Sequence, residues 1–257
     1  MEARKVNAIN GWQWIKQGYW LFRKNPLLWM ALTAIGVIGM LGIAIIPVVG
    51  DPLATLLFPV LLAGYMFGCH ALAQGEELEL SHLFAGFRQH AQQLVTLGGI
   101  NLVGQLLILG VMMLTGGATL VGILMDGKPV NDPAILMQAM AGAGLALLLG
   151  ITLFSILMMA MQFAPMLVIF GKMQPVPAMK ISLRAFFRNV IPLTVYGVML
   201  LPFVILATLP MMLGWPVLLP IVIASLYATY RDLFPMQPEA SAATGGEAAA
   251  PDDQVHP

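Results

Sequence analysis

Charge is scarce in this sequence. Of its 257 residues, only 9% are Asp, Glu, Lys or Arg, whereas 59% are hydrophobic. Soluble domains carry about 25% charged residues, so this chain lacks the polar side chains that would cover a water-facing surface of its size. The shortage excludes an ordinary soluble domain and indicates that lipid is the solvent for most of the chain.

Cysteine is nearly absent, and the formal net charge is zero. The single Cys69 cannot form an internal disulfide, and the chain has no Cys-x-x-Cys pattern. Zero net charge argues against a nucleic-acid partner, because nucleic acids are bound by an excess of Lys and Arg. We therefore expect no cofactor, no metal and no nucleic acid.

Catalytic motifs are missing as well. The chain has no G-x-S-x-G, no phosphate-binding loop and no H-E-x-x-H. After the second apolar segment the chain collects potential metal ligands, but their spacing matches no metal motif and favours a solvated connector. These residues are Cys69, His70, Glu76, Glu77, Glu79, His82 and His90. We expect that the protein is not an enzyme.

Long apolar segments dominate what is present. A membrane-spanning helix needs about 20 mostly apolar residues, and six segments qualify or nearly qualify: 26–49, 53–72, 94–125, 134–171, 190–213 and 217–230. We predict an all-α integral membrane protein with six transmembrane helices. The third and fourth segments exceed one crossing, so they either extend past the bilayer as long helix ends or leave an apolar hairpin near residues 116–140 at or beyond the outer interface. Whether this hairpin is re-entrant stays open, and Gly116-Gly117 is the expected break.

Lys and Arg are distributed very unevenly. Eleven of the twelve precede the first segment, lie in the second-to-third or fourth-to-fifth connections, or follow the last segment, and Lys128 stands alone on the other side. Cytoplasmic loops of membrane proteins carry such an excess. We therefore expect both termini to be cytoplasmic.

Amphipathic stretches precede the odd-numbered segments. On a helical wheel, residues 12–24 gather aromatic side chains on one side and cations on the other, as interfacial helices do. Phe-Arg pairs recur before the third and fifth segments. We interpret 1–234 as one membrane domain of three units, each an interfacial helix followed by a two-span hairpin (10–73, 78–173 and 176–232). Residues 235–257 are predicted to be a disordered cytoplasmic tail.

The predicted interfacial residues are aromatic or cationic. They are Trp12, Trp14, Arg23, Lys24, Phe87, Arg88, Lys180, Arg184, Phe187, Arg188 and Arg231. Lys180, Arg184 and Arg188 recur every four residues and form one basic stripe. Such a stripe either binds anionic lipid headgroups or forms a solvated face that only fixes the topology. Membrane lipids, anionic ones in particular, are the expected partners.

Uncharged polar residues occur within the apolar segments, although Asp, Glu, Lys, Arg and His are missing from their middles. Asn101 and Gln105 share one helical face, and Gln162 stands three residues before Pro165. They either join helices by hydrogen bonds or line a substrate path. Ion-coupled carriers usually hold charged residues at this depth. The pattern therefore disfavours an ion-coupled carrier and leaves open a carrier of an apolar solute.

Several short motifs point to a known group of proteins. "MEARKV", "GWQW", "LFRKNPLLW", "EELELSHLFAGFR" and "YATYRDLF" resemble an uncharacterised family of small bacterial inner-membrane proteins. The repeated arrangement of an interfacial helix and a two-span hairpin is also similar to the membrane domain of some glycerophosphodiester phosphodiesterases. The resemblance implies an inner-membrane location but no activity. We predict a non-enzymatic structural, regulatory or lipid-associated component, with a transporter or flippase of an apolar or lipid-like solute as the alternative.

Overall fold

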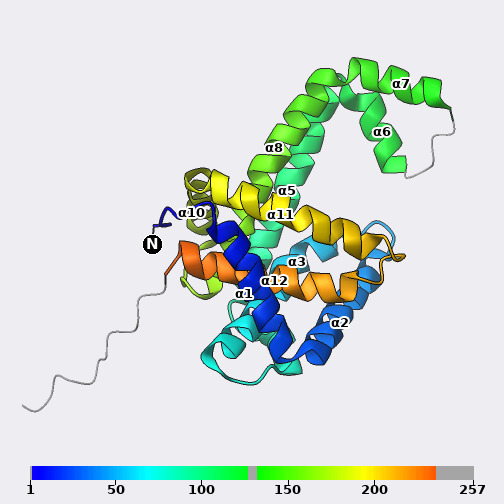
Figure 1. Ribbon diagram of the computed structural model, residues 1–257. Helices are drawn as coiled ribbons and strands as arrows, with labels where there is room; N and C mark the ends of the chain where they lie inside the picture. The colour runs from blue at the N-terminus through cyan, green and yellow to red at the C-terminus, as the bar shows by residue number, and fades with distance from the viewer. Residues whose placement is uncertain (1, 127–131, 236–257) are drawn as a thin grey trace, which may run out of the picture.

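The computed structural model describes residues 2–126 and 132–235, and within them the protein is helical and has no strand (Figure 1). The predicted tail therefore lies almost entirely outside the described residues, as does Lys128. The elements are α1 (Asn10–Lys24), α2 (Pro26–Ala44), α3 (Gly50–Gln74), the 3₁₀ helix η1 (Leu80–Phe84), α4 (Ala85–Arg88), α5 (Ala91–Met112), the π-helical turn η2 (Met113–Gly117), α6 (Ala118–Asp126), α7 (Pro133–Gly142), α8 (Gly144–Gln162), α9 (Ala164–Ile169), α10 (Pro175–Arg188), α11 (Val190–Thr208) and α12 (Trp215–Leu233).

Five helical stretches of the described chain are long and apolar enough to cross a membrane. They are Pro26–Ala44, Gly50–Gln74, Ala91–Ile123, Gly144–Ile169 and Val190–Thr208. The predicted sixth span corresponds to α12, which has 19 residues but is not one of the five. Polar residues, including Arg231 and Asp232, fall within α12. The structure therefore supports a helical membrane protein with five candidate spans.

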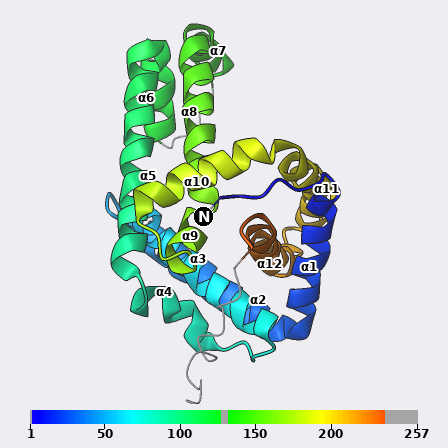
Figure 2. The same ribbon diagram turned by 90° about the vertical axis from the view of Figure 1, so that its left-hand side faces the viewer.

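The body of the molecule is built around α12. We define the body as α1–α4 and α9–α12 together with the first half of α5. Helices α1, α2, α3 and α11 all contact α12, and Figure 2 shows α12 nearly end on, with its neighbours arranged around it. Most buried apolar side chains belong to one cluster, which includes Trp14, Trp29, Leu97 and Tyr227. This cluster is the core of the fold.

An arm extends from this body. It consists of the outer parts of α5 and α8, which run side by side, together with α6 and α7 at its tip (Figures 1 and 2). As predicted, the helix breaks at Gly116, where the backbone has φ +99° and leaves the helical region together with Thr115. Positive φ is easily adopted only by glycine. Residues 127–131 of the predicted hairpin, which join α6 to α7, lie outside the described range.

The second interfacial helix differs from the prediction. Instead of one interfacial helix at the start of the 78–173 unit, the chain forms the two short helices η1 and α4 and then breaks at His90, which has φ +59°. Helix α5 begins immediately afterwards at Ala91. A non-glycine residue at positive φ interrupts helical hydrogen bonding. Only α1 and α10 are therefore long amphipathic helices before a span.

Candidate functional site

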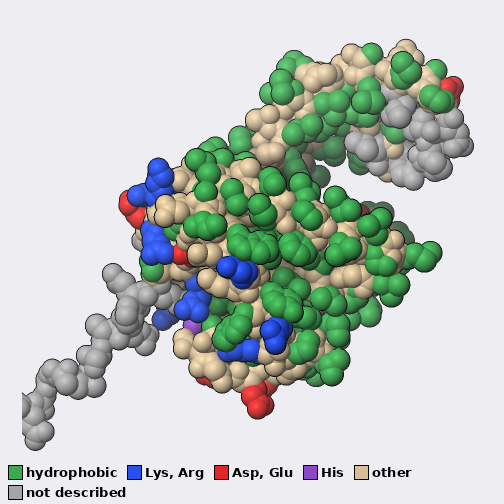
Figure 3. Space-filling view, in the orientation of Figure 1, with side chains coloured by type: hydrophobic (Ala, Val, Ile, Leu, Met, Phe, Trp, Pro, Cys, Tyr) green, Lys and Arg blue, Asp and Glu red, His purple; other side chains and the backbone are tan. Residues whose placement is uncertain are grey.

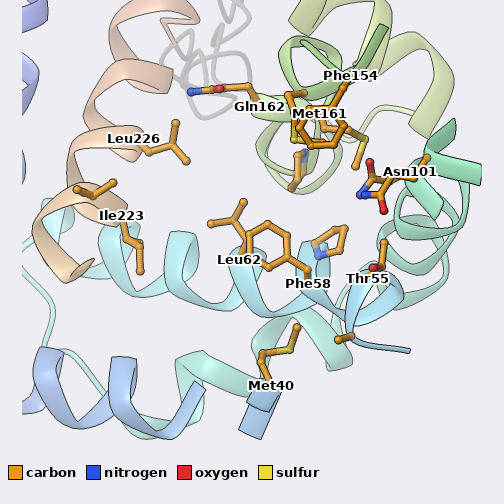
Figure 4. A pocket seen from close by; sticks show the side chains of 16 residues that line it. Met40, Thr55, Phe58, Leu62, Asn101, Phe154, Met161, Gln162, Ile223 and Leu226 are labelled. Carbon is orange, nitrogen blue, oxygen red and sulfur yellow. The ribbon is translucent and has the colours of Figure 1, made fainter. Parts of the chain in front are cut away.

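A cavity of about 590 Å³ lies where the arm joins the body. Its walls come from α2, α3 and α12 on one side and from α5, α8 and α9 on the other (Figure 4). Binding sites for small molecules commonly have volumes of about 300–1,000 Å³ and mostly apolar walls. The lining residues are Met40, Ala54, Thr55, Phe58, Pro59, Leu62, Asn101, Gln105, Phe154, Met158, Met161, Gln162, Pro165, Val222, Ile223 and Leu226.

The three intramembrane polar residues singled out from the sequence all line this cavity. Asn101 and Gln105 come from adjacent turns of α5, and Gln162 is the last residue of α8. The chain breaks immediately after Gln162, before Pro165 in the first turn of α9. Proline lacks an N–H and favours such a break. The cavity therefore combines carboxamides from two helices that lie far apart in the sequence.

A hydroxyl group from α10 stabilises the break beside Gln162. The Ser182 Oγ accepts a hydrogen bond from the Phe163 N–H at 3.1 Å and donates one to the Met159 carbonyl at 2.8 Å. Ser182 is fully buried. Helix ends leave backbone groups without partners unless a side chain supplies them. This pair of bonds holds the break between α8 and α9 against α10.

The cavity wall has one polar atom that stands out. The Asn101 carboxamide oxygen is buried and has no hydrogen-bond partner among the described residues. By contrast, the Thr55 hydroxyl already donates to the Asp51 carbonyl at 2.9 Å. Figure 4 shows Asn101 reaching in from α5, between Phe154 and Phe58. The site is thus an apolar pocket beside a buried acceptor that has no partner among the described residues.

A second, smaller cavity adjoins the first. It measures about 320 Å³, and its lining shares Met40, Phe58, Leu62 and Ile223 with the larger cavity. The other wall residues come from α2, α3 and α12. Its polar wall groups are already engaged, since the Thr33 hydroxyl donates to the Trp29 carbonyl and the Tyr65 hydroxyl to the Leu32 carbonyl. It extends the apolar space between α2 and α3.

The cations Arg23 and Lys24 end α1 in exposed positions. Lys24 Nζ donates to the Leu72 carbonyl at 2.6 Å and lies 4.3 Å from the Trp20 ring centroid. A cation is favourable at the C-terminal end of a helix, and here the helix is α3.

The predicted interfacial residue Trp12 is 36% exposed and stacks on Phe203 at a centroid distance of 6.5 Å.

The remaining predicted interfacial side chains are mostly exposed. The basic stripe of α10 lies opposite the buried face of that helix and is fully outward-facing. Figure 3 shows Lys and Arg gathered at the end of the body where α1 and α10 lie, whereas the described part of the arm shows none on this face. The exposed residues are Phe87, Arg88, Lys180, Arg184, Phe187, Arg188 and Arg231.

Trp14 departs from the prediction because it is fully buried. Its indole Nε1 donates to the Asp232 carboxylate at 2.8 Å, and Asn10 Nδ2 donates to the same carboxylate at 2.7 Å. Arg4 forms an ion pair with Asp232. Helix α1 packs along α12 rather than lying free at the surface, so this tryptophan joins two ends of the chain instead of facing headgroups.

Asp232 was not singled out by the sequence analysis. Burial alone would raise the pKa of this carboxyl, but the hydrogen bonds from Asn10, Trp14 and Arg4 outweigh it and lower the pKa below its usual value. The one sequence signal for Asp232 was a single acidic residue just after the last apolar segment.

Asn189 was also missed by the sequence analysis. It accepts a hydrogen bond from the Val6 N–H at 3.0 Å and donates one to the Arg4 carbonyl. Together these residues fix the N-terminal segment.

The potential metal ligands after the second span do not assemble. Within the described ranges, no group of three or more His, Cys, Asp or Glu side chains is placed to hold a metal ion. Glu79 and His82 instead cap η1, and His70 hydrogen-bonds to the Tyr227 hydroxyl at 2.9 Å. Glu79, His82 and His70 therefore form hydrogen bonds within the fold.

Comparison with known proteins gives one informative relative. No protein-family model matches the chain, and no solved structure matches it. The chain is 31% identical, over 258 aligned residues, to a protein of Burkholderia thailandensis described as a probable inner membrane protein. The alignment covers 92% of this chain and 95% of the relative. With helices long and apolar enough to span a bilayer, this chain belongs to the family of that probable inner membrane protein.

Proposed function

We propose that the protein is a non-enzymatic, lipid-associated component of the inner membrane that holds an apolar or lipid-like molecule in the cavity between arm and body. The observation that carries this proposal is the cavity itself, about 590 Å³ in volume and walled mainly by apolar side chains. In a membrane, such a space is filled by a hydrocarbon chain. The known relative supports the membrane location.

The proposed topology has six spans, with residues 217–230 of α12 as the sixth. Helix α12 is wrapped by α1, α2, α3 and α11, so it can cross a bilayer with few side chains facing lipid. An even number of spans places both termini on one side, and the cations gathered near α1 and α10 favour the cytoplasm. A plan of three hairpin units would also fit the similarity to the phosphodiesterase membrane domain.

The basic stripe of α10 is proposed to bind anionic lipid headgroups. Lys180, Arg184 and Arg188 are exposed along one face, and each cation near an anionic surface contributes about 1 kcal/mol. Arg188 also lies 4.0 Å from Glu2. The stripe and the cavity would engage different parts of the membrane, one the headgroups and the other the acyl region.

Transport of the bound molecule is the second candidate. The adjoining cavities favour it, because four shared lining residues place them along one apolar route between helices. A transporter or flippase would move labelled lipid across liposomes containing the purified protein, whereas a holding protein would bind the lipid and leave its distribution between leaflets unchanged.

Lipids that purify with the protein test the proposal. Ala54→Phe places a ring in the cavity, and Ala34→Phe adds the same ring at an exposed site on α2 outside the cavity lining. Mass spectrometry should find an apolar lipid retained by the wild type and by Ala34→Phe but lost from Ala54→Phe. Substituting Lys180, Arg184 and Arg188 with Gln should reduce only the anionic phospholipids.

Two results would contradict the proposal. If the wild type retains no more apolar lipid than an unrelated membrane protein purified alongside it, the cavity does not hold a lipid-like molecule. If the triple Gln variant retains its anionic lipids, the stripe acts only as a solvated face that sets topology.

A further inference from the structure

The turn between α11 and α12, residues 209–214, is apolar although it is exposed. Met211 is 92% exposed and Leu213 is 75% exposed. Turns that face water are usually built from Gly, Asn, Asp and Ser, whereas no charged residue occurs anywhere between Arg188 and Arg231. Figure 1 places this turn at the end of the body far from the N-terminus, and Figure 3 shows hydrophobic side chains gathered at that end. The turn therefore lacks the side chains that would hydrate it.

The backbone of the turn is unfavourable for the residues that occupy it. Met211 and Met212 have φ of +51° and +66°, in the left-handed region where Gly and Asn are the usual residues. A larger side chain in this region costs about 1–2 kcal/mol per residue. In water, Asn or Gly would avoid this cost and would expose less apolar surface. Methionine at both positions is favoured where the surroundings are themselves apolar.

The polar groups of the turn are paired within the hairpin. Of the nine residues 209–217, six donate the backbone N–H to a carbonyl group, and Pro210 and Pro216 have no N–H. The Trp215 indole Nε1 donates to the Thr208 hydroxyl at 3.3 Å, and that hydroxyl donates one turn back within α11 at 2.8 Å. Irregular backbone is normally excluded from lipid because its unpaired groups cost several kcal/mol. That obstacle is small here. The six backbone donors are Leu209, Met212, Leu213, Gly214, Trp215 and Val217.

The length of the hairpin sets the depth of its turn. Helix α11 rises about 28 Å over its 19 residues, and α12 rises about 24 Å from Trp215 to Arg231, at 1.5 Å per residue. The hydrocarbon core of a bilayer is about 30 Å thick. In the proposed topology Arg188 and Arg231 lie at the cytoplasmic surface, so both helices end before the outer edge of the core. Any tilt of the helices shortens their reach further.

The α2–α3 turn, residues 45–49, differs in one respect. It is also apolar, and its Val48 is 94% exposed with φ +69°. However, the exposed Asp51 follows three residues later, in the first turn of α3. A carboxylate within the hydrocarbon is costly, so Asp51 keeps the α2–α3 turn at the membrane surface. The α11–α12 turn has no charged residue to keep it there.

We infer that the α11–α12 turn is embedded among the acyl chains of the outer leaflet, where Met211, Met212 and Leu213 contact lipid chains instead of water. This surface continues the exposed apolar side of α11, which includes Ile205 and Leu206. The inference rests on the proposed topology and is independent of the cavity. The hairpin of α11 and α12 then meets water only at its cytoplasmic end.

Spin labels measure this depth directly. Cys69 is fully buried, so a nitroxide attached through Met211→Cys in the full-length protein reports on the turn, and wild type treated with the same label gives the background. In phosphatidylcholine nanodiscs, the label should collide severalfold more with oxygen, which concentrates among acyl chains, than with nickel(II) ethylenediaminediacetate, which stays in water. Asp51→Cys in the other turn and Glu77→Cys in the polar connection after α3 are matched exposed controls. Both should collide more with the nickel complex.

Two results would overturn the inference. If the nickel complex reaches Met211→Cys as readily as Asp51→Cys, the turn lies in water or among headgroups. If neither oxygen nor nickel reaches the label, protein covers the turn, as a second copy of the chain would. Leu213→Cys, in the same turn, decides by the same measurement if Met211→Cys does not fold. Retention of apolar lipid by wild type and Ala54→Phe is a separate measurement, so the cavity proposal stands or fails independently.

Discussion

The body and the arm contain similar apolar side chains but use them differently. In the body, one continuous cluster buries large residues such as Trp14, Trp29 and Leu97. Among the described residues of the arm, the separate buried cluster holds Leu120, Ala143 and Ala146. The arm also exposes Leu114 at 88% and Met137 at 72%. Protein contacts therefore shape the body, whereas lipid must cover most of the arm.

Hydrogen bonds show the same difference. In the body, side chains such as Asp232, Asn189 and Ser182 connect segments that are far apart in the sequence. Along the arm, Thr115 and Thr152 donate to carbonyl groups one turn back in their own helix. The body is thus fixed by long-range bonds and the arm by local ones. Substitutions in the body should therefore disturb distant segments, whereas substitutions in the arm should act locally. Four predictions test this difference.

The largest effect is expected for Trp14→Ala. Truncating a fully buried Trp typically costs about 3–5 kcal/mol, and this change also removes a hydrogen bond to Asp232. Trp12→Ala is the matched control two residues away, since Trp12 is 36% exposed. It should cost about 1 kcal/mol, the scale of one aromatic pair. Free energies of unfolding measured in detergent check this prediction. Equal losses of stability for Trp14→Ala and Trp12→Ala would contradict the burial of Trp14.

An intermediate effect is expected for Asp232→Asn. Hydrogen bonds to charged groups contribute about 1.5–3 kcal/mol each, and three side chains donate to this carboxylate. An amide keeps some of these bonds, so we expect a loss of about 2 kcal/mol of unfolding free energy. Asp51→Asn, at an exposed carboxyl in the first turn of α3, should change stability far less.

The same variant gives a pH test. The folded pKa of Asp232 is lowered, so its contribution to stability is complete above the unfolded pKa of about 4 and is lost as pH falls through the lower folded pKa. Unfolding free energies of the wild type and Asp232→Asn should therefore converge below about pH 4. A difference that stays constant down to pH 2 would contradict the prediction.

The smallest global effect is expected for Gly116→Ala in the arm. Alanine at φ +99° is strained, typically by about 1–2 kcal/mol, but the arm has few contacts through which to transmit the change. Hydrogen exchange should accelerate near residues 113–126 and leave α1 and α12 unchanged. Gly122→Ala, inside α6 with open space around it, should slow local exchange instead. Faster exchange throughout the body would show that arm and body form one cooperative unit.

Parts of the fold were predictable because their signals are local. The apolar segments that contain α2, α3 and α11 follow from hydropathy, and the break at Gly116 follows from glycine chemistry. The length of the second interfacial helix was not predictable from amphipathic spacing, since a positive φ at His90 interrupts it. Spacing placed Asn101 and Gln105 on one helical face, but nothing local placed Gln162 in the lining of the same cavity.

The sequence by itself determined that this chain lives in lipid, where its long helices run, and that its cations lie at a few sites along the chain. Tertiary structure alone decided which apolar side chains face protein, that Trp14 is buried against Asp232, and that three carboxamides line one cavity. The physical reason is that lipid tails are as apolar as Leu. A membrane helix therefore carries little contrast between its lipid-facing and protein-facing sides, and only long-range contacts distinguish them.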